Sequence, residues 1–180
     1  MIQIAAYKGK SFISRMIRLL TYSEYSHIAI RFMVDMEVEY SGGLRVIAAG
    51  NVIEAWSGGV RLAKDISAQH TPGTAVDLYE FKTPLTTDQA TYMARFLVSQ
   101  LGKPYDYPNV LRFVPVVRAL LPTPPAYSWN RTHVFCSELA IQAGAEAGRP
   151  LLERCKAWEV PPRDPPRSPA LMFSKTLITQ

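Results

Sequence analysis

Residues 132–147 read THVFCSELAIQAGAEA, and this stretch decides the fold. Small and apolar residues occupy nearly every side of the helix that it predicts, so the helix belongs inside a core and not on a surface. Cys136 lies at or just before its first turn, where unpaired backbone N–H groups and the helix dipole lower the pKa of a thiol. A lone cysteine on an apolar helix is also a common small core residue. The stretch therefore predicts a buried central helix with Cys136 as a candidate nucleophile.

The segments around this helix predict an α+β fold. β-Branched residues and period-two alternation run from His27 to Phe81 between Ser-Gly-Gly turns, a pattern typical of an antiparallel meander. The expected strands cover residues 1–7, 27–34, 46–49, 52–56 and 75–81, and the expected flanking helices cover 11–20 and 86–101. We therefore expect an antiparallel sheet of about five strands packed against the cysteine helix.

The helix expected at 11–20 is amphipathic. One of its faces carries Phe12, Ile13, Met16, Ile17 and Leu20. Arg15 and Arg18 lie on the opposite face. We expect the apolar face to pack on the core, because about ten residues with two arginines bind lipid weakly. The alternative is a helix lying on a membrane, which keeps a peripheral membrane contact open.

The composition of the chain limits which other classes of protein it could belong to. The chain has 180 residues, 48% of them hydrophobic and 19% charged, which suits one domain over residues 1–180. Its net charge of +5 is spread as singles and pairs of basic residues, so we expect no nucleic-acid partner. Neither a signal-peptide pattern nor a long uncharged apolar run is present, so a cytoplasmic protein with free thiols is expected. A phage-encoded protein, or one exported by a dedicated secretion system, would have the same features.

The prolines are unevenly distributed. Of 14 prolines, only Pro72 and Pro84 lie before residue 100, and the others fall mainly between residues 105 and 129 and after residue 158. Proline breaks helix interiors and central strands. These two stretches flank the cysteine helix, and we expect them to form ordered, irregular walls beside it.

His27 is the best placed of the three histidines to act as a base for Cys136. It begins a strand and projects away from that strand's apolar face. Glu54 is a candidate to orient the imidazole, because carboxylates are uncommon on strands. His70 lies in a turn and His133 precedes the helix, and an isolated histidine more often satisfies buried backbone groups. No short Cys or His pair has the spacing of metal ligands, so we expect neither a metal nor a cofactor.

Four segments, in this order along the chain, resemble the circularly permuted NlpC-type, papain-like cysteine hydrolases, the YiiX/YaeF-like group. They are YSH at 25–27, VIEAW at 52–56, GKPYDY at 102–107 and FCSELA at 135–140. The resemblance covers most of the chain and implies a permuted papain-like fold. It also implies Cys136 as nucleophile, His27 as general base and Glu54 as the residue that holds the imidazole.

The same resemblance implies that Tyr105 places its hydroxyl near the thiolate or the oxyanion. Phe135 stands where unpermuted relatives have Asp and Glu138 where they have Gly, so a peptidoglycan specificity is not carried over. In this group, insertions such as the one after Tyr105 are suspected of lining a lipid or acyl site. The candidate pocket and oxyanion residues are Trp56, Phe113, Trp129 and, at the helix start, Ser137.

The leading hypothesis is a cysteine-dependent amidase, peptidase or esterase that forms a thioester acyl-enzyme. Its substrate would be a peptide, a lipid or an acyl amide. Two alternatives stay open: a non-catalytic module that binds a lipid or acylated ligand, and an acyltransferase in which an alcohol or amine replaces water. The sequence sets neither the substrate nor the oligomeric state.

Overall fold

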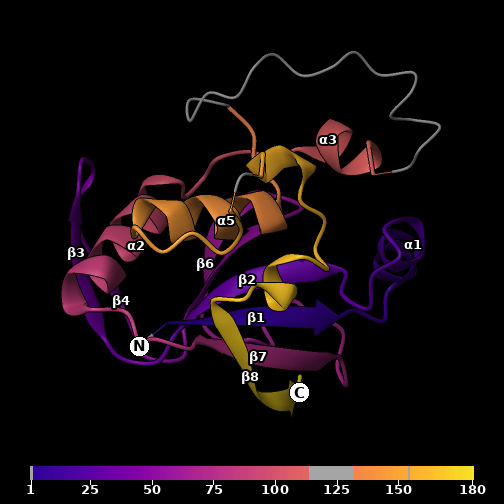
Figure 1. Ribbon diagram of the computed structural model, residues 1–180, viewed down its shortest axis with the longest axis horizontal. Helices are drawn as coiled ribbons and strands as arrows, with labels where there is room; N and C mark the ends of the chain where they lie inside the picture. The colour runs from indigo at the N-terminus through magenta and orange to yellow at the C-terminus, as the bar shows by residue number, and fades with distance from the viewer. Residues whose placement is uncertain (1, 114–131, 154) are drawn as a thin grey trace.

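The structure is a computed structural model that describes residues 2–113, 132–153 and 155–180. Its centre is a six-stranded antiparallel sheet in the order β6-β5-β2-β1-β7-β8 (Figure 1). The strands are β1 (Ile2–Lys8), β2 (His27–Phe32), β5 (Val52–Trp56), β6 (Gly59–Ala63), β7 (Ala75–Phe81) and β8 (Leu171–Ile178). A separate hairpin consists of β3 (Met36–Tyr40) and β4 (Gly43–Ile47).

The α+β class predicted from the sequence is confirmed, with six strands in the sheet where about five were expected. The strands do not follow one another as a meander, because β2 pairs with β5 and β7 returns to pair with β1. β6 was missed because it is short and begins with a glycine. β8 was missed because it is an edge strand with mostly exposed side chains, which shows no clean alternation.

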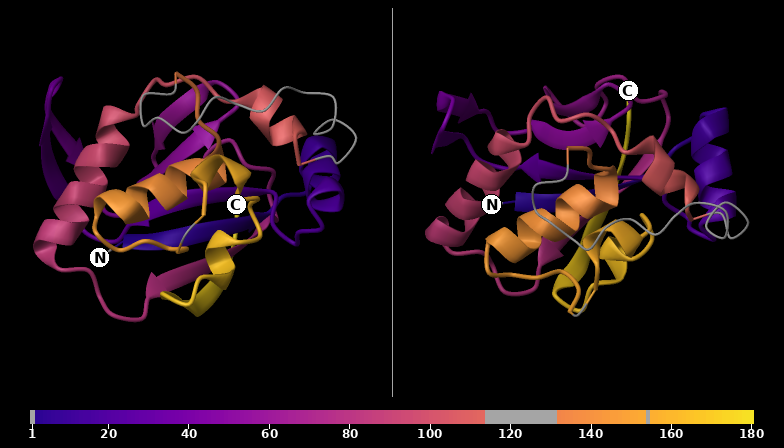
Figure 2. Two further views of the ribbon diagram at one scale, coloured as in Figure 1. Left: turned by 45° about the horizontal axis from the view of Figure 1, so that its top comes forward. Right: turned by 90° about the horizontal axis from the view of Figure 1, so that it is seen from above.

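Helix α5 (Cys136–Glu146) is the central helix that the sequence predicted, although it begins at Cys136 and not at residue 132. Residues 136–144 are all buried. Figure 2 shows α5 lying across one face of the sheet, with α2 (Thr87–Ser99) beside it. The capping box expected at Thr86 and Gln89 begins α2. The core between these helices and the sheet includes Ile4, Ile30, Ile53, Met93, Leu97, Leu139 and Ala143.

The two faces of β2 separate the core from the site. Ile28, Ile30 and Phe32 point into the core below α5, as alternation predicts. Ala29 points to the opposite face, where a smaller apolar cluster includes Tyr7, Val52, Val76 and Leu78. His27 therefore begins the strand on the second face, opposite Tyr7 of β1.

Helix α1 (Phe12–Leu20) begins at the predicted cap, Ser11, but the expectation that it packs on the core was wrong. Phe12 is 76% exposed and Leu19 is 73% exposed. No described side chain of α1 joins either core cluster. The physical reason is its place in the chain: α1 connects two neighbouring antiparallel strands, β1 and β2, so it lies beyond their ends, where no sheet face reaches it (Figure 1).

The proline-rich segment after residue 158 is ordered, as expected. It contains two short 3₁₀ helices, η1 (Ala157–Glu159) and η2 (Pro165–Arg167), before β8. Four of its prolines are buried: Pro161, Pro162, Pro165 and Pro166. Ser137 of α5 donates a hydrogen bond from its side chain to the Val160 carbonyl at 2.6 Å, which ties this wall to the central helix. The other proline-rich stretch is described only as far as Phe113, through α3 (Tyr107–Leu111).

Helices long and apolar enough to cross a bilayer are absent from the described residues. The longest helix among the described residues, α2, has 13 residues, whereas a transmembrane helix needs about 20.

Close packing of α5 predicts the effect of one methyl group. A Cβ added at Gly144 would lie 2.9 Å from the backbone carbonyl oxygen of Arg149. Gly144→Ala should therefore lower the free energy of unfolding by about 1–3 kcal/mol, although the same change in an open helix stabilises by about 0.5–1 kcal/mol. Urea denaturation measures the difference. Gly58→Ala is the control, because a Cβ there meets open space, and a Gly144→Ala protein as stable as wild type would contradict the packing.

Candidate active site

The β5–β6 hairpin positions the carboxylate at the centre of the site. Its strands are joined by Ser57 and Gly58, and this short turn sets Glu54 directly opposite Arg61. The Arg61 guanidinium donates to Oε1 of Glu54 through Nε at 3.0 Å and through a terminal nitrogen at 2.5 Å. This fork fixes one carboxylate oxygen and leaves Oε2 for other donors.

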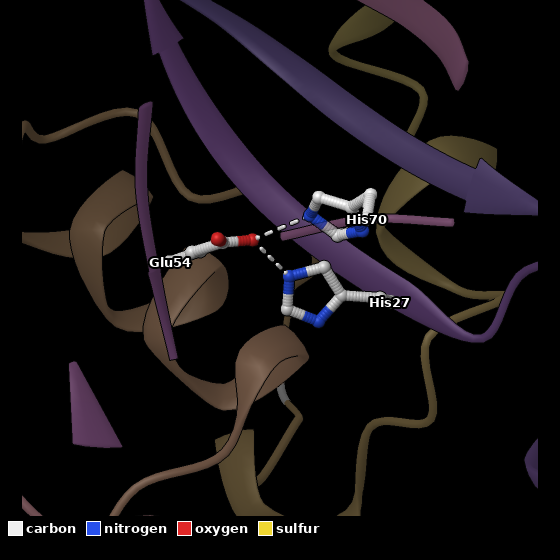
Figure 3. A group of neighbouring side chains, drawn as sticks. All are labelled: His27, Glu54 and His70. Carbon is white, nitrogen blue, oxygen red and sulfur yellow. Dashed lines mark hydrogen bonds and ion pairs between the residues drawn. The ribbon is translucent and has the colours of Figure 1, made fainter. Parts of the chain in front are cut away.

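His27 binds the second oxygen. Its Nε2 lies 2.6 Å from Oε2 of Glu54, and the Glu54 side chain is 1% exposed. The structure thus brings together two of the predicted site residues, from β2 and β5 (Figure 3). Since Nε2 faces the carboxylate, Nδ1 is the ring nitrogen left for the thiol.

His70 also contacts Glu54, which the sequence analysis missed. Its Nε2 lies 3.2 Å from the same Oε2 atom (Figure 3). Its ring stacks on Tyr7 with centroids 4.1 Å apart, so a strand residue holds the loop that follows β6. Burial lowers the pKa of His70 against the opposing effect of Glu54, which keeps the ring neutral at neutral pH. A neutral ring donates to a carboxylate only from a protonated nitrogen, so His70 carries its proton on Nε2.

The electrostatics of the His27–Glu54 pair favour a charged His27 imidazole. Burial would raise the pKa of Glu54, but hydrogen bonds from His27 and His70 outweigh it and hold the carboxyl well below its usual range. Burial would likewise lower the pKa of His27. The hydrogen bonds and negative charges of Cys136 and Glu54 reverse that effect and raise it to about 9.

Cys136 is the first residue of α5, and its thiol interacts with the His27 imidazole. The helix cap, Phe135, offers no side-chain hydrogen bond to the helix start. Burial would raise the pKa of the Cys136 thiol. The hydrogen bond and charge of His27 outweigh burial, together with backbone N–H groups of Ile28 and Ser137, and the pKa falls below its usual value. The geometry therefore favours a thiolate beside an imidazolium.

Tyr105 contacts the same sulfur. Burial and the nearby thiolate raise the pKa of its hydroxyl well above the usual value, so it stays protonated and donates to Cys136. The backbone explains this placement. Tyr105 forms a parallel bridge with Val134, two residues before the cysteine, and Val134 donates from its backbone N–H to the Pro104 carbonyl at 3.0 Å.

An apolar cavity of about 380 Å³ adjoins these groups. His27, Trp56, Tyr105 and Phe113 line it together with residues of α1 and α3. Cys136, 2% exposed, does not line the cavity itself but contacts two residues that do. Trp56 also packs edge-on against both His27 and His70, and the Arg61 guanidinium lies 4.7 Å from the centre of its ring.

Ser137 and Trp129 were also predicted as site residues. The Ser137 side chain is fully buried and bonded to the C-terminal wall, so this residue offers the site its backbone N–H and not its hydroxyl. Trp129 lies outside the described residues.

His27, Glu54 and His70 supply the donor atoms of a divalent metal site, and these atoms lie within 4.8 Å of one another. Two imidazoles and a carboxylate are a known zinc donor set. The present geometry does not fit a bound ion. His27 Nε2 and Glu54 Oε2 are 2.6 Å apart, whereas two ligands of one tetrahedral zinc lie about 3.3 Å apart. Arg61 already neutralises the carboxylate. The three residues are joined by hydrogen bonds instead.

Comparisons with known proteins support the fold. No protein-family model matches the chain, and no curated protein sequence matches it. Among solved structures, it is similar to the crystal structure of metalloprotein yiiX from Escherichia coli O157:H7, with a TM-score of 0.60 and 18% identity. The match covers 97% of this chain and 96% of the other. The resemblance to the YiiX-like group is therefore confirmed at the level of the fold.

The two cysteines should differ in their response to pH. Cys136 has a lowered pKa, whereas burial raises the pKa of Cys155. The iodoacetamide alkylation rate of Cys136 should therefore reach its plateau at a lower pH than that of Cys155, and below its own pKa each rate falls by about tenfold per pH unit. Peptide mass spectrometry measures both rates in one sample, with a chelator present. His27→Ala should move the Cys136 profile to higher pH, and coincident pH profiles of the two thiols in the wild-type protein would rule out an activated thiol.

Arg61 should act as a positioning residue through Glu54. Arg61→Met removes the fork on Oε1, so Glu54 holds His27 less firmly and the pKa of Cys136 rises toward that of an ordinary thiol. Each unit of that rise lowers the alkylation rate at pH 6 by about tenfold, while the rate above pH 9 stays the same. Arg61→Lys should restore part of the effect. Arg45→Met, at an exposed residue of β4, is the matched control, and an unshifted pH profile in Arg61→Met would refute the role.

Proposed function

We propose that this protein is a cysteine-dependent hydrolase that cleaves an amide or ester bond and binds the apolar acyl part of its substrate in the cavity beside His27. The observation that carries the proposal is the continuous chain from Cys136 through His27 to Glu54, with an apolar cavity at its side. The likeness to yiiX supports the fold on which this chemistry is placed.

In the first step, the Cys136 sulfur attacks the substrate carbonyl carbon and the carbonyl π electrons move to oxygen. Backbone N–H groups at the start of α5, including that of Ser137, and the Tyr105 hydroxyl are the donors available to this oxyanion. The oxyanion then collapses and the bond to the leaving amine or alcohol breaks. That group takes the proton from Nδ1 of His27, which leaves a thioester on Cys136.

In the second step, water replaces the leaving group. Neutral His27 takes a proton from water as the oxygen attacks the thioester carbon. Collapse of this intermediate breaks the carbon–sulfur bond and releases the acid, and the proton stays on His27. The thiolate–imidazolium pair is restored. Glu54, held by Arg61, keeps the ring oriented through both steps.

A non-catalytic module that binds an acyl ligand is the second candidate. The observation that favours it is that Cys136 is 2% exposed and does not itself line the cavity. In that case the cavity would bind acyl chains, and the wild-type protein would show no turnover. A Cys136→Ser protein would bind the chains as tightly as the wild type does.

The apolar cavity predicts a dependence on acyl chain length. For p-nitrophenyl esters from acetate upward, kcat/KM should rise by up to about fourfold per carbon, since a buried CH₂ contributes about 0.8 kcal/mol, until the cavity is full. Val110→Trp narrows the cavity and should lower the rates of long esters while leaving acetate unchanged. Release of p-nitrophenol measures both.

Two variants and one co-substrate control this experiment. Cys136→Ser should abolish turnover, and Cys155→Ser, at the other free cysteine, should leave it unchanged. Turnover that survives Cys136→Ser would contradict the proposal. An added primary amine separates hydrolysis from transfer, because a transferase would convert the acyl donor to a stable amide.

A further inference from the structure

Helices α1 and α3 lie near each other at one end of the molecule (Figures 1 and 2), and both contribute residues to the lining of the cavity. Apart from Ser14, the cavity-lining residues that they contribute are Met16, Ile17, Leu20, Tyr107, Val110 and Leu111. His27 and Tyr105 line the same cavity. The two helices therefore frame an apolar route toward the groups that contact Cys136.

Several large apolar side chains of these helices, and that of Tyr22 just after α1, are exposed. We call them the α1–α3 rim, which consists of Phe12, Met16, Leu19, Tyr22, Tyr107 and Leu111. All six are exposed, from 43% for Met16 to 82% for Tyr22. Apolar clusters of this kind mark surfaces that bind other proteins or membranes. The short connection that places α1 beyond the strand ends is the reason that no part of the sheet covers it.

The charge next to the rim selects between these partners. Residues 8–22 contain Lys8, Lys10, Arg15 and Arg18 and no acidic residue. Lys8 forms ion pairs with Asp77 and Glu24, and Arg18 donates to the Gly9 carbonyl. Lys10 and Arg15 are exposed. An apolar surface flanked by exposed cations is complementary to an anionic lipid bilayer.

We propose that the α1–α3 rim docks on an anionic lipid bilayer, with Phe12, Leu19 and Tyr22 inserted at the interface and Lys10 and Arg15 against the headgroups. The cavity then opens toward the lipid, and an acyl chain passes from the bilayer past α1 and α3 to His27. Docking itself needs no catalysis, but delivery of an acyl group to Cys136 rests on the proposed hydrolase function.

Vesicle binding by the full chain carrying Cys136→Ser tests the docking without turnover. With vesicles of phosphatidylcholine and phosphatidylserine at about 7:3, the protein should cosediment, and with phosphatidylcholine alone it should bind much more weakly. Lys10→Gln with Arg15→Gln should weaken binding by about 25-fold, since each cation contributes about fivefold near such a surface. High salt should have a similar effect.

The contribution of the apolar side chains of the rim to vesicle binding is tested with a matched control. Phe12→Ser with Leu19→Ser should weaken binding by at least about 100-fold, about tenfold or more for each buried side chain. Leu44→Ser with Val46→Ser changes two exposed apolar residues on β4, away from the rim, and should have no effect. Far-UV circular dichroism verifies that each variant is folded.

Three results would overturn the docking: no binding to anionic vesicles, equal binding to neutral ones, or equal losses in the rim and β4 variants. Burial of the rim in a dimer without lipid, seen by sedimentation of Phe12→Ser with Leu19→Ser against wild type, would also overturn it. Hydrolysis is scored separately with a short soluble ester, which the rim variant should cleave as wild type does. Vesicle binding without any ester hydrolysis would leave docking intact and refute the proposed function instead.

Discussion

A carboxylate inside a protein must be surrounded by donors, and Glu54 is surrounded by three side chains from three segments. Arg61 occupies one oxygen, and His27 and His70 share the other. Without its partners the charge would have to be neutralised or exposed, since breaking a buried pair costs about 3–5 kcal/mol. Glu54 thus ties the loop before β7 to the strands β2, β5 and β6, which their backbone pairing already holds side by side. The orientation of His27, and with it the state of the Cys136 thiol, follows from that arrangement.

The periodicity of apolar residues along the sequence predicted much of this fold. Alternation identified β5 and β7 at their observed bounds, and the caps at Ser11 and Thr86 identified the starts of α1 and α2. The position of α1 could not be predicted in the same way. An amphipathic pattern says which side chains are apolar, but only the pairing of β1 with β2 decides whether a core is within reach.

The site likewise contains residues that the sequence pattern predicted and residues that it did not. Cys136, His27, Glu54 and Tyr105 were named from the sequence. In the structure, His27 lies between Glu54 and Cys136, and Tyr105 interacts with Cys136. Arg61 was missed although a signal existed: the Ser57-Gly58 turn fixes a register that puts residue 61 opposite residue 54. His70 gave no such signal, because its approach depends on a long loop and on stacking against Tyr7. Irregular backbone has no period from which a contact can be inferred.

The order of the elements has a consequence for biosynthesis. His27 and Glu54 leave the ribosome early, whereas the helix that carries Cys136 and the strand β8 follow much later. The central helix packs on β2 across a gap of more than a hundred residues in the chain, and such distant contacts form slowly. The proposed base and its carboxylate are therefore synthesised before the proposed nucleophile. In the proposed mechanism, the thiolate–imidazolium pair can form only after the segment that carries Cys136 has been added to the chain.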